Sequence, residues 1–284
     1  MPLASIDAAR VAVCGAGYTG QAIARTLRRM GKQVLVTDSR PLDQLEGAAR
    51  VLADLEVELH AGGHDPAVVT SAELVVISPG VPFLTTPALI QARQQGIPVW
   101  GEVEFAARLT SAKVVGVTGT KGKTTTSTLA SRMLDAPLAN AEAYSARGVP
   151  LIELVIDNPD MPLVVAEMSS YQLESVDRLR PYVAALLNVG EDHTERHPTR
   201  PEYLGAKCNI FRNQTGDDRS VYGWDDAAVR EVGQSLPTIK AAFSLAAEPD
   251  YGLWASAEGI EMRLPAAVGG QAGRLMAWDE VHPP

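Results

Sequence analysis

The chain has 284 residues, of which 46% are hydrophobic and 21% are charged, and its formal net charge is −9. This length predicts two domains with a core each, and the acidic balance argues against a general nucleic-acid-binding protein. No apolar run approaches the ~20 residues that span a membrane, no signal peptide opens the chain, and two cysteines are too few for a disulfide framework, so we expect a cytoplasmic protein.

The first predicted element is a nucleotide-binding βαβ unit. The apolar strand Arg10–Cys14 runs into the glycine turn Gly15–Gly20, which has the pattern G-x-G-x-x-G, and the helix Gln21–Met30 follows. The second strand, Gln33–Thr37, ends at Asp38, an acid whose spacing suits a contact with a ribose hydroxyl. The alternative is a turn that only joins a strand tightly to a helix.

Further strands and helices alternate up to about residue 110. The predicted strand Glu73–Ser78 is broken by Pro79 and Gly80 at its carboxyl end, where ligands bind in open α/β sheets. His60 and His64 precede this strand, and we interpret both as loop residues rather than as ligands.

The central part of the chain is predicted to form a phosphate-binding loop. Apolar residues from Val114 to Val117 indicate a buried strand, a glycine-rich turn follows, and Ser127–Leu134 is predicted to be helical. Lys123 would reach the β- and γ-phosphates of a nucleotide, and the Thr124 hydroxyl would bind Mg²⁺. The glycines do not follow the common motif strictly, so a plain strand–turn–helix joint is the alternative.

Polar residues follow two later strands. Pro162–Ala166 ends at Glu167, which fits the usual second carboxylate for Mg²⁺ beside a phosphate loop, or else an acid in a solvated loop. The strand Tyr182–Val189 leads to His193, which we interpret as a metal or phosphate contact. Lys207 lies in a predicted helix, where composition alone indicates a solvated lysine.

The remaining chain completes the predicted architecture. From Asp250 onward the sequence predicts short strands separated by glycine turns. We therefore predict an α/β protein with an N-terminal Rossmann-like domain built on a parallel sheet (residues 1–110). A central P-loop-type α/β ATPase domain with a small β extension is expected to follow (residues 111–284). Residues 135–150 are irregular and stay unassigned.

Four motifs resemble, in order, those of the Mur ligase family of peptidoglycan synthesis. They are Gly119–Thr125, Glu167–Glu174, Asn188–His193 and Tyr203–Asn213. The stretches Ser78–Gly80 and Gly101–Glu104, together with the N-terminal glycine turn, resemble the branch of the family that adds D-glutamate.

The resemblance implies three groups of site residues. The UDP-bearing substrate would contact Gly15, Tyr18, Thr19, Gly20, Asp38, Ser39, Arg40, Ser78, Pro79, Gly80, Ser169 and Gln172. ATP would contact Gly119, Thr120, Lys121, Gly122, Lys123, Thr124 and Thr125. Two Mg²⁺ ions would be held by Thr124, Glu167, His193 and a carbamylated Lys207, and the catalytic residues would be Lys123, Glu167, His193 and Lys207.

The implied reaction is ATP-driven amide bond formation between UDP-N-acetylmuramoyl-L-alanine and D-glutamate through an acyl phosphate. The family also has a third domain, which these residues lack, so the chain alone is not expected to complete the reaction. A monomer is expected. Two alternatives are a remnant that binds UDP-sugar or ATP without turnover, and a dinucleotide-dependent oxidoreductase built on Gly15–Gly20.

Overall fold

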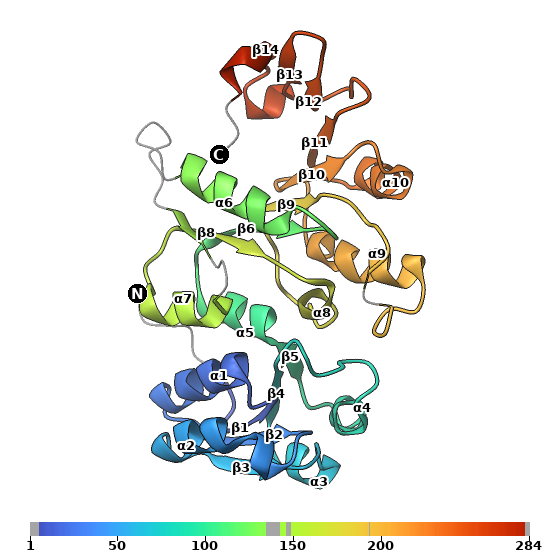
Figure 1. The fold of residues 1–284 in the computed structure, drawn as a ribbon. Helices are drawn as coiled ribbons and strands as arrows, with labels where there is room; N and C mark the ends of the chain where they lie inside the picture. The colour runs from blue at the N-terminus through green and yellow to red at the C-terminus, as the bar shows by residue number, and fades with distance from the viewer. Residues whose placement is uncertain (1–5, 135–142, 146–148, 193, 282–284) are drawn as a thin grey trace. The chain divides into compact units, whose positions relative to one another are not determined.

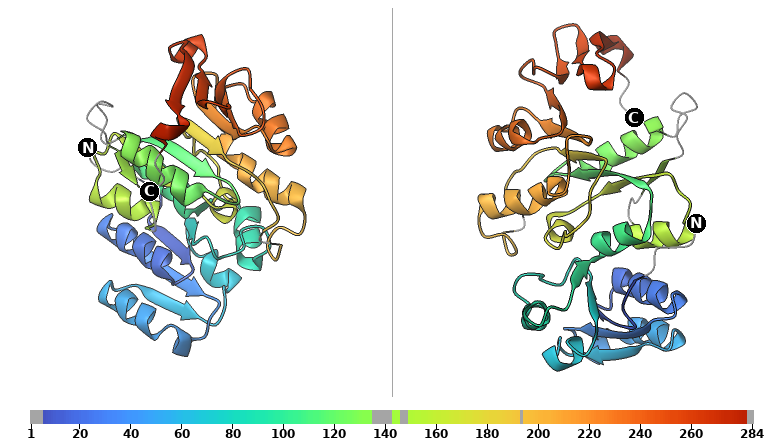
Figure 2. Two further views of the ribbon diagram at one scale, coloured as in Figure 1. Left: turned by 45° about the horizontal axis from the view of Figure 1, so that its top comes forward. Right: turned by 180° about the vertical axis from the view of Figure 1, so that it is seen from behind.

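The computed structural model describes residues 6–134, 143–145, 149–192 and 194–281, drawn in colour in Figures 1 and 2. Contacts divide the chain into two compact units. Unit 1 comprises Met1–Ala112, Glu142–Pro162 and Ser170–Leu179, and unit 2 comprises Lys113–Ala141, Leu163–Ser169 and Arg180–Pro284. Within the described ranges, no helix combines the length and the apolar character that a bilayer crossing requires.

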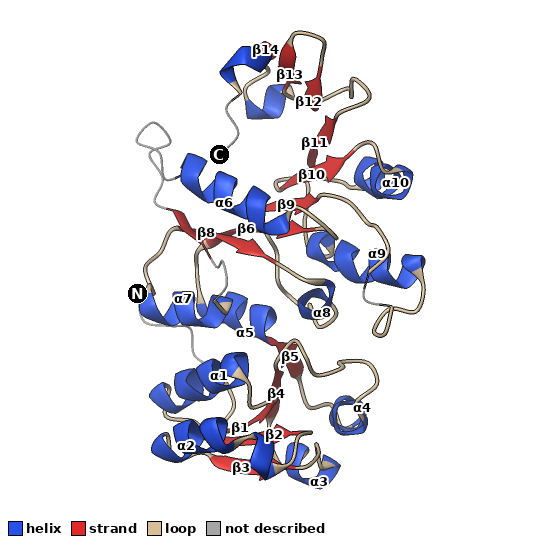
Figure 3. Cartoon of the chain, in the orientation of Figure 1, coloured by secondary structure: helices blue, strands red, loops and turns tan. Residues whose placement is uncertain are grey.

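Unit 1 is built on a five-stranded parallel sheet with the order β3-β2-β1-β4-β5. Its strands, red in Figure 3, are β1 (Arg10–Cys14), β2 (Gln33–Asp38), β3 (Glu58–Ala61), β4 (Leu74–Ile77) and β5 (Val99–Gly101). The central strand β1 is fully buried from Val11 to Cys14, as expected of an apolar run covered on both faces of a parallel sheet.

Helices cover both faces of this sheet because parallel crossovers are right-handed and the strand order reverses after β3. The crossovers contain α1 (Tyr18–Arg29), α2 (Glu46–Asp54), α3 (Pro66–Val69) and α4 (Pro87–Gln94). The reversal puts the switch point of the sheet between β1 and β4. In open α/β sheets this is where ligands bind, at the carboxyl ends of the strands.

Helix α5 (Glu102–Leu109) is the packing centre for the later segments of unit 1, α7 (Leu151–Asp157) and α8 (Ser170–Leu173). The carboxylate of Glu102 accepts a hydrogen bond from the backbone N–H of Ile152 over 2.8 Å. The fully buried carboxylate of Glu104 accepts hydrogen bonds from three successive backbone N–H groups, those of Asp177, Arg178 and Leu179. Two buried glutamates of α5 therefore hold, through hydrogen bonds, backbone segments that are distant from this helix in sequence.

Unit 2 is built on a mixed sheet in which the order β14-β13-β12-β11-β10-β9-β6-β8 is observed. The strands are β6 (Lys113–Thr118), β8 (Leu163–Glu167), β9 (Val183–Leu186), β10 (Arg219–Gly223), β11 (Ile239–Ser244), β12 (Gly252–Ala255), β13 (Gly259–Arg263) and β14 (Ala272–Ala277). Pairing is parallel from β8 to β12 and antiparallel from β12 to β14, which forms the predicted β extension. The predicted α/β class is confirmed.

The helices of unit 2 are α6 (Lys123–Leu134), α9 (Arg200–Cys208) and α10 (Ala227–Ser235), and a short strand β7 (Ala143–Ser145) precedes α7 along the chain. Helix α6 begins four residues before the predicted Ser127, so Lys123 and Thr124 belong to its first turn. Helix α9 begins at Arg200 because the side chain of Thr199 caps it and a proline occupies its first turn. Short 3₁₀ turns cover Leu42–Gln44, Asn209–Phe211, Ala266–Val268 and Trp278–Glu280.

Candidate functional site

In unit 2, the glycine-rich turn after β6 has a backbone that only glycine adopts readily. The φ angles of Gly119 and Gly122 are +156° and +86°, in the region that side chains with a Cβ disfavour. A Cβ at Gly119 would also lie 3.0 Å from Cβ of Leu187. The unusual glycine spacing in the sequence is therefore matched to this turn.

Two polar side chains from the first turn of α6 are held against the loop and the neighbouring strand. The Lys123 ammonium donates to the carbonyl oxygens of Gly119, over 2.9 Å, and Thr120, over 3.1 Å. The Thr124 hydroxyl donates to Oε2 of Glu167 over 2.7 Å. The carboxyl end of β8 thus delivers its carboxylate to the start of α6, because β6 and β8 are adjacent and parallel.

The segment after β9 fixes the shape of the loop. Oδ1 of Asn188 accepts hydrogen bonds from the backbone N–H groups of Thr120 (3.1 Å) and Lys121 (2.9 Å), and its Nδ2 donates to the carbonyl of Lys121 over 3.1 Å. The N–H of Gly190 donates to the Thr120 hydroxyl over 2.9 Å. Asn188 is a positioning residue for the loop, a role that the sequence motif alone did not assign.

Lys207 is only 1% exposed, so the expectation of a solvated lysine is wrong. Its Nζ donates to the Gly119 carbonyl over 2.9 Å and lies 4.4 Å from the centre of the Tyr203 ring. Burial, and then the nearby charge of Lys123, lower the pKa of Lys207 to about 8. The uncharged amine, which is the form that reacts with CO₂, is therefore more populated near neutral pH than in an ordinary lysine.

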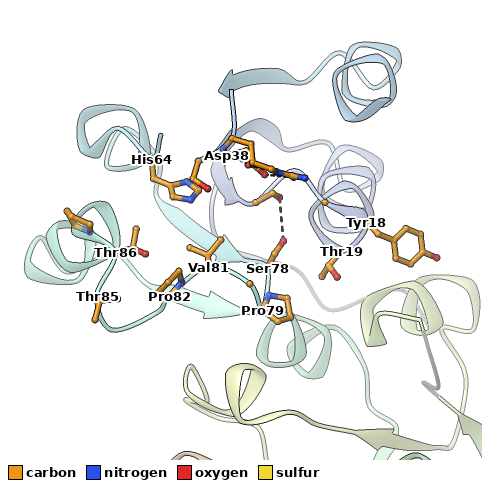
Figure 4. Close-up of a pocket in the computed structure, with 16 residues that line it drawn as sticks. Tyr18, Thr19, Asp38, His64, Ser78, Pro79, Val81, Pro82, Thr85 and Thr86 are labelled. Atoms are coloured by element: carbon orange, nitrogen blue, oxygen red, sulfur yellow. Dashed lines mark hydrogen bonds and ion pairs between the residues drawn. The ribbon is translucent and has the colours of Figure 1, made fainter. Parts of the chain in front are cut away.

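In unit 1, a cavity of about 850 Å³ opens at the switch point of the sheet (Figure 4). Nine of the residues assigned to the UDP-bearing substrate line it: Gly15, Tyr18, Thr19, Asp38, Ser39, Arg40, Ser78, Pro79 and Gly80. Gly20 lies beside it in α1, where an added Cβ would approach the carbonyl oxygen of Gly15 to 1.7 Å. This position needs glycine if the turn is to close on the helix.

Asp38 holds the turn and Arg40 together. Its carboxylate accepts hydrogen bonds from the backbone N–H of Ala16 over 2.7 Å and from Nε and Nη2 of Arg40 over 2.9 Å each. Burial opposes ionisation, but these hydrogen bonds outweigh it and lower the pKa of Asp38 to about 2. Both carboxylate oxygens are engaged within the protein, so Asp38 positions Arg40 at the cavity.

The structure adds His64 to the cavity, a residue that the sequence indicated only as part of a loop. Its Nδ1 lies 2.7 Å from the hydroxyl of Thr37, and its side chain lines the cavity together with Val81 and Pro82. His64 lies in the loop after β3, which ends at Ala61, and this loop is at the edge of the sheet where the carboxyl ends of the parallel strands meet.

Three expected site residues are not part of these two clusters. Gln172 lies on α8 and hydrogen-bonds with Glu102, and Ser169 directly precedes that helix. Neither of them lines the cavity of unit 1. His193 lies outside the described residues. Within the described ranges, no group of three or more histidine, cysteine or acidic side chains is arranged to hold a metal ion.

Comparisons with known proteins identify both halves of the chain. Residues 9–101 match the model of the Mur ligase MurD-like N-terminal domain, and residues 117–258 match the Mur ligase middle domain. The chain is 41% identical over 251 residues to the UDP-N-acetylmuramoylalanine--D-glutamate ligase of Syntrophotalea carbinolica, covering 88% of this chain and 55% of that protein. Identity to the protein of the same name from Trichlorobacter lovleyi is 39% over 265 residues, covering 91% and 59%.

The chain therefore spans somewhat more than half the length of these curated relatives. Among solved structures, it resembles the UDP-N-acetylmuramate:L-alanyl-gamma-D-glutamyl-meso-diaminopimelate ligase from Neisseria meningitides with a TM-score of 0.56. That match has 18% identity and covers 90% of this chain and 84% of the other, so it bears on the fold alone.

Proposed function

Because the chain belongs to the Mur ligase family, we propose that it forms the UDP-sugar-binding and ATP-binding parts of an ATP-dependent ligase of peptidoglycan synthesis. The reaction would join D-glutamate to UDP-N-acetylmuramoyl-L-alanine, as the names of the curated relatives indicate for those proteins. The observation that carries the proposal is the phosphate loop, in which Lys123, Thr124 and Glu167 meet at the carboxyl ends of adjacent strands. We expect the ligase to act as a monomer in the cytoplasm.

The residues at the loop fit one Mg²⁺ site. Thr124 and Glu167 bring a hydroxyl and a carboxylate oxygen within 2.7 Å of each other, and oxygen donors are the ligands that Mg²⁺ prefers. A bound Mg²⁺ would neutralise charge on the transferring phosphoryl group. Lys123 would bind the β- and γ-phosphates in place of the loop carbonyls to which it donates.

A second Mg²⁺ site depends on Lys207. As an ammonium group this side chain repels a metal ion, whereas addition of CO₂ to its amine would give an anionic carbamate. Its lowered pKa and its position at the Gly119 carbonyl support that modification. His193 would complete the site with the carbamate.

The proposed reaction has two steps. A carboxylate oxygen of the L-alanyl group attacks the γ-phosphorus of ATP, the bond to the β-phosphate oxygen breaks, and ADP leaves. The amine of D-glutamate then attacks the acyl carbon and expels inorganic phosphate, with loss of the ammonium proton. Lys123 and the loop N–H groups would stabilise the phosphoryl group during transfer.

Calorimetry with UDP-N-acetylmuramoyl-L-alanine, ATP–Mg²⁺ and NADH tests the proposal. We expect heat with the first two ligands and none with NADH. Lys123→Ala should weaken ATP binding at least tenfold and leave the UDP-sugar unaffected, whereas Arg40→Ala should do the reverse. Binding of NADH in the absence of UDP-sugar binding would refute the ligase and favour an oxidoreductase. Phosphate release by a longer chain, but not by these residues, would exclude a remnant that only binds.

A further inference from the structure

Thr86 lies at the start of α4, where this helix meets the unit 1 cavity. It is the N-cap residue of the helix, and Pro87 occupies the first turn. A threonine at this position usually accepts a hydrogen bond from a backbone N–H of the first turn, as Thr199 does at α9. The side chain of Thr86 makes no such bond. Its hydroxyl therefore does not serve the helix.

The hydroxyl of Thr86 is open to the cavity and to little else. Thr86 is 8% exposed and is one of the residues that line the cavity. Within the part of the chain that the structure describes, its hydroxyl makes no hydrogen bond with another protein group. Burial of a hydroxyl without a partner is unfavourable. This group is therefore available to a ligand, and Val81 and Pro82 beside it in the lining offer apolar surface to a flat ring.

The place of Thr86 in the cavity indicates which part of a nucleotide it meets. Phosphates belong at the turn before α1, where the N–H groups of the helix start lie, and the nucleoside belongs beside the end of β2. Figure 4 shows Tyr18 and Thr19 at one end of the cavity, Thr86 and Pro82 at the other, and Asp38 between them. A nucleotide with its phosphates at the α1 turn therefore directs its base toward Thr86.

We propose that the Thr86 hydroxyl donates a hydrogen bond to O4 of the uracil ring and thereby holds the base in the cavity. This inference rests on the proposed function and adds a base-binding residue to it. O4 lies across the ring from the nitrogen that carries the ribose, so it is the carbonyl oxygen farthest from the phosphates. The other carbonyl oxygen, O2, is next to the ribose bond. A hydroxyl at the far end of the cavity meets O4, and its proton can rotate toward that acceptor.

Calorimetric titration of UDP into the full chain tests the inference. Thr86→Val removes the hydroxyl and keeps the branched shape, and we expect it to weaken UDP binding about five- to tenfold. Thr86→Ser keeps the hydroxyl and should bind UDP within about twofold of wild type. The matched control is Thr85→Val, the same change at the exposed preceding residue, which should bind UDP as wild type does.

The outcomes separate this inference from the proposed function. Undiminished UDP binding by Thr86→Val would overturn the inference, whereas failure of wild type to bind UDP would overturn the proposed function. Urea unfolding without ligand excludes a role in the helix. Because the hydroxyl makes no bond in the free protein, Thr86→Val should unfold at the same urea concentration as wild type. A lower midpoint would show that the hydroxyl stabilises α4 and would contradict the inference.

Thio analogues of UDP identify the atom that the hydroxyl contacts. Sulfur is a weaker hydrogen-bond acceptor than oxygen, so wild type should bind 4-thio-UDP more weakly than UDP. This difference should vanish in Thr86→Val, whereas with 2-thio-UDP the effect of Thr86→Val should be as large as with UDP. Equal affinity of wild type for UDP and 4-thio-UDP would overturn the contact with O4 without the use of any variant.

Discussion

Replacing Lys207 by methionine should make the protein more stable at neutral pH, and in a longer chain that completes the reaction it should abolish the proposed ligase activity. Methionine matches the length of lysine and carries no charge. The pKa of Lys207 is lowered from 10.5 to about 8, and it is 1% exposed, so solvent screens little of the effect. A shift of this size means that the folded state at pH 7 is destabilised by about 3 kcal/mol relative to an unperturbed lysine.

The sign of the pH dependence follows from proton binding. Between pH 8 and 10.5 the unfolded chain keeps the lysine proton and the folded chain loses it, so stability rises with pH in this interval. The penalty is constant below about pH 8 and falls to about 1 kcal/mol near pH 9.5. Lysine donates a hydrogen bond to the Gly119 carbonyl that methionine cannot make. This bond offsets about 1–1.5 kcal/mol of the cost of burying the lysine charge.

We therefore expect the free energy of unfolding of Lys207→Met to exceed that of wild type by about 1–2 kcal/mol at pH 7 and to equal it near pH 9.5. Urea unfolding in bicarbonate-free buffer measures this, and a Trp100→Phe background leaves tryptophan reporters only in unit 2. Lys113→Met, at the exposed start of β6, is the matched control for losing a lysine. A Lys207→Met protein less stable than wild type by more than about 1 kcal/mol at pH 7 would refute the desolvation argument.

Three shorter predictions concern unit 1. Glu104→Gln should lower the free energy of unfolding by about 2–4 kcal/mol, measured by urea titration, because its carboxylate is fully buried and accepts three backbone hydrogen bonds. Gly20→Ala should weaken UDP binding at least tenfold in calorimetry, whereas Gly17→Ala, whose Cβ would contact nothing within 4 Å, should bind normally. Asp38→Asn should lose about 2 kcal/mol of stability above pH 4, and the difference from wild type should vanish as the pH falls through about 2, which acid-unfolding curves would show.

The elements that sequence predicted well are those whose signal is local. The strands β1 and β6 can be recognised from their own residues, because a strand covered on both faces needs apolar side chains throughout. The glycine turns that follow them are equally visible in the sequence. The start of α6 was misjudged because Lys123 and Thr124 look like loop residues until their side chains find partners on the loop and on β8.

The buried state of Lys207 and the contact between His64 and Thr37 were not predictable in this way. Lys207 is 88 residues from the carbonyl that it contacts, and His64 is 27 residues from Thr37. No local pattern reports such partners. Lysine is charged and long, so composition favours the surface, and a histidine after a short edge strand resembles any other loop residue.

The two lysines at the phosphate loop argue for an anionic ligand. The ammonium groups of Lys123 and Lys207 both donate to the Gly119 carbonyl, each over 2.9 Å, so two like charges share one neutral acceptor. Charge-assisted hydrogen bonds to phosphate oxygens are stronger than those to a carbonyl. When a triphosphate binds, the two lysines would therefore give up the shared carbonyl oxygen and donate to several phosphate oxygens, which are stronger acceptors. A dinucleotide bound only at the glycine turn of unit 1 would leave this arrangement without a function, which is why the ligase is the better account of both units.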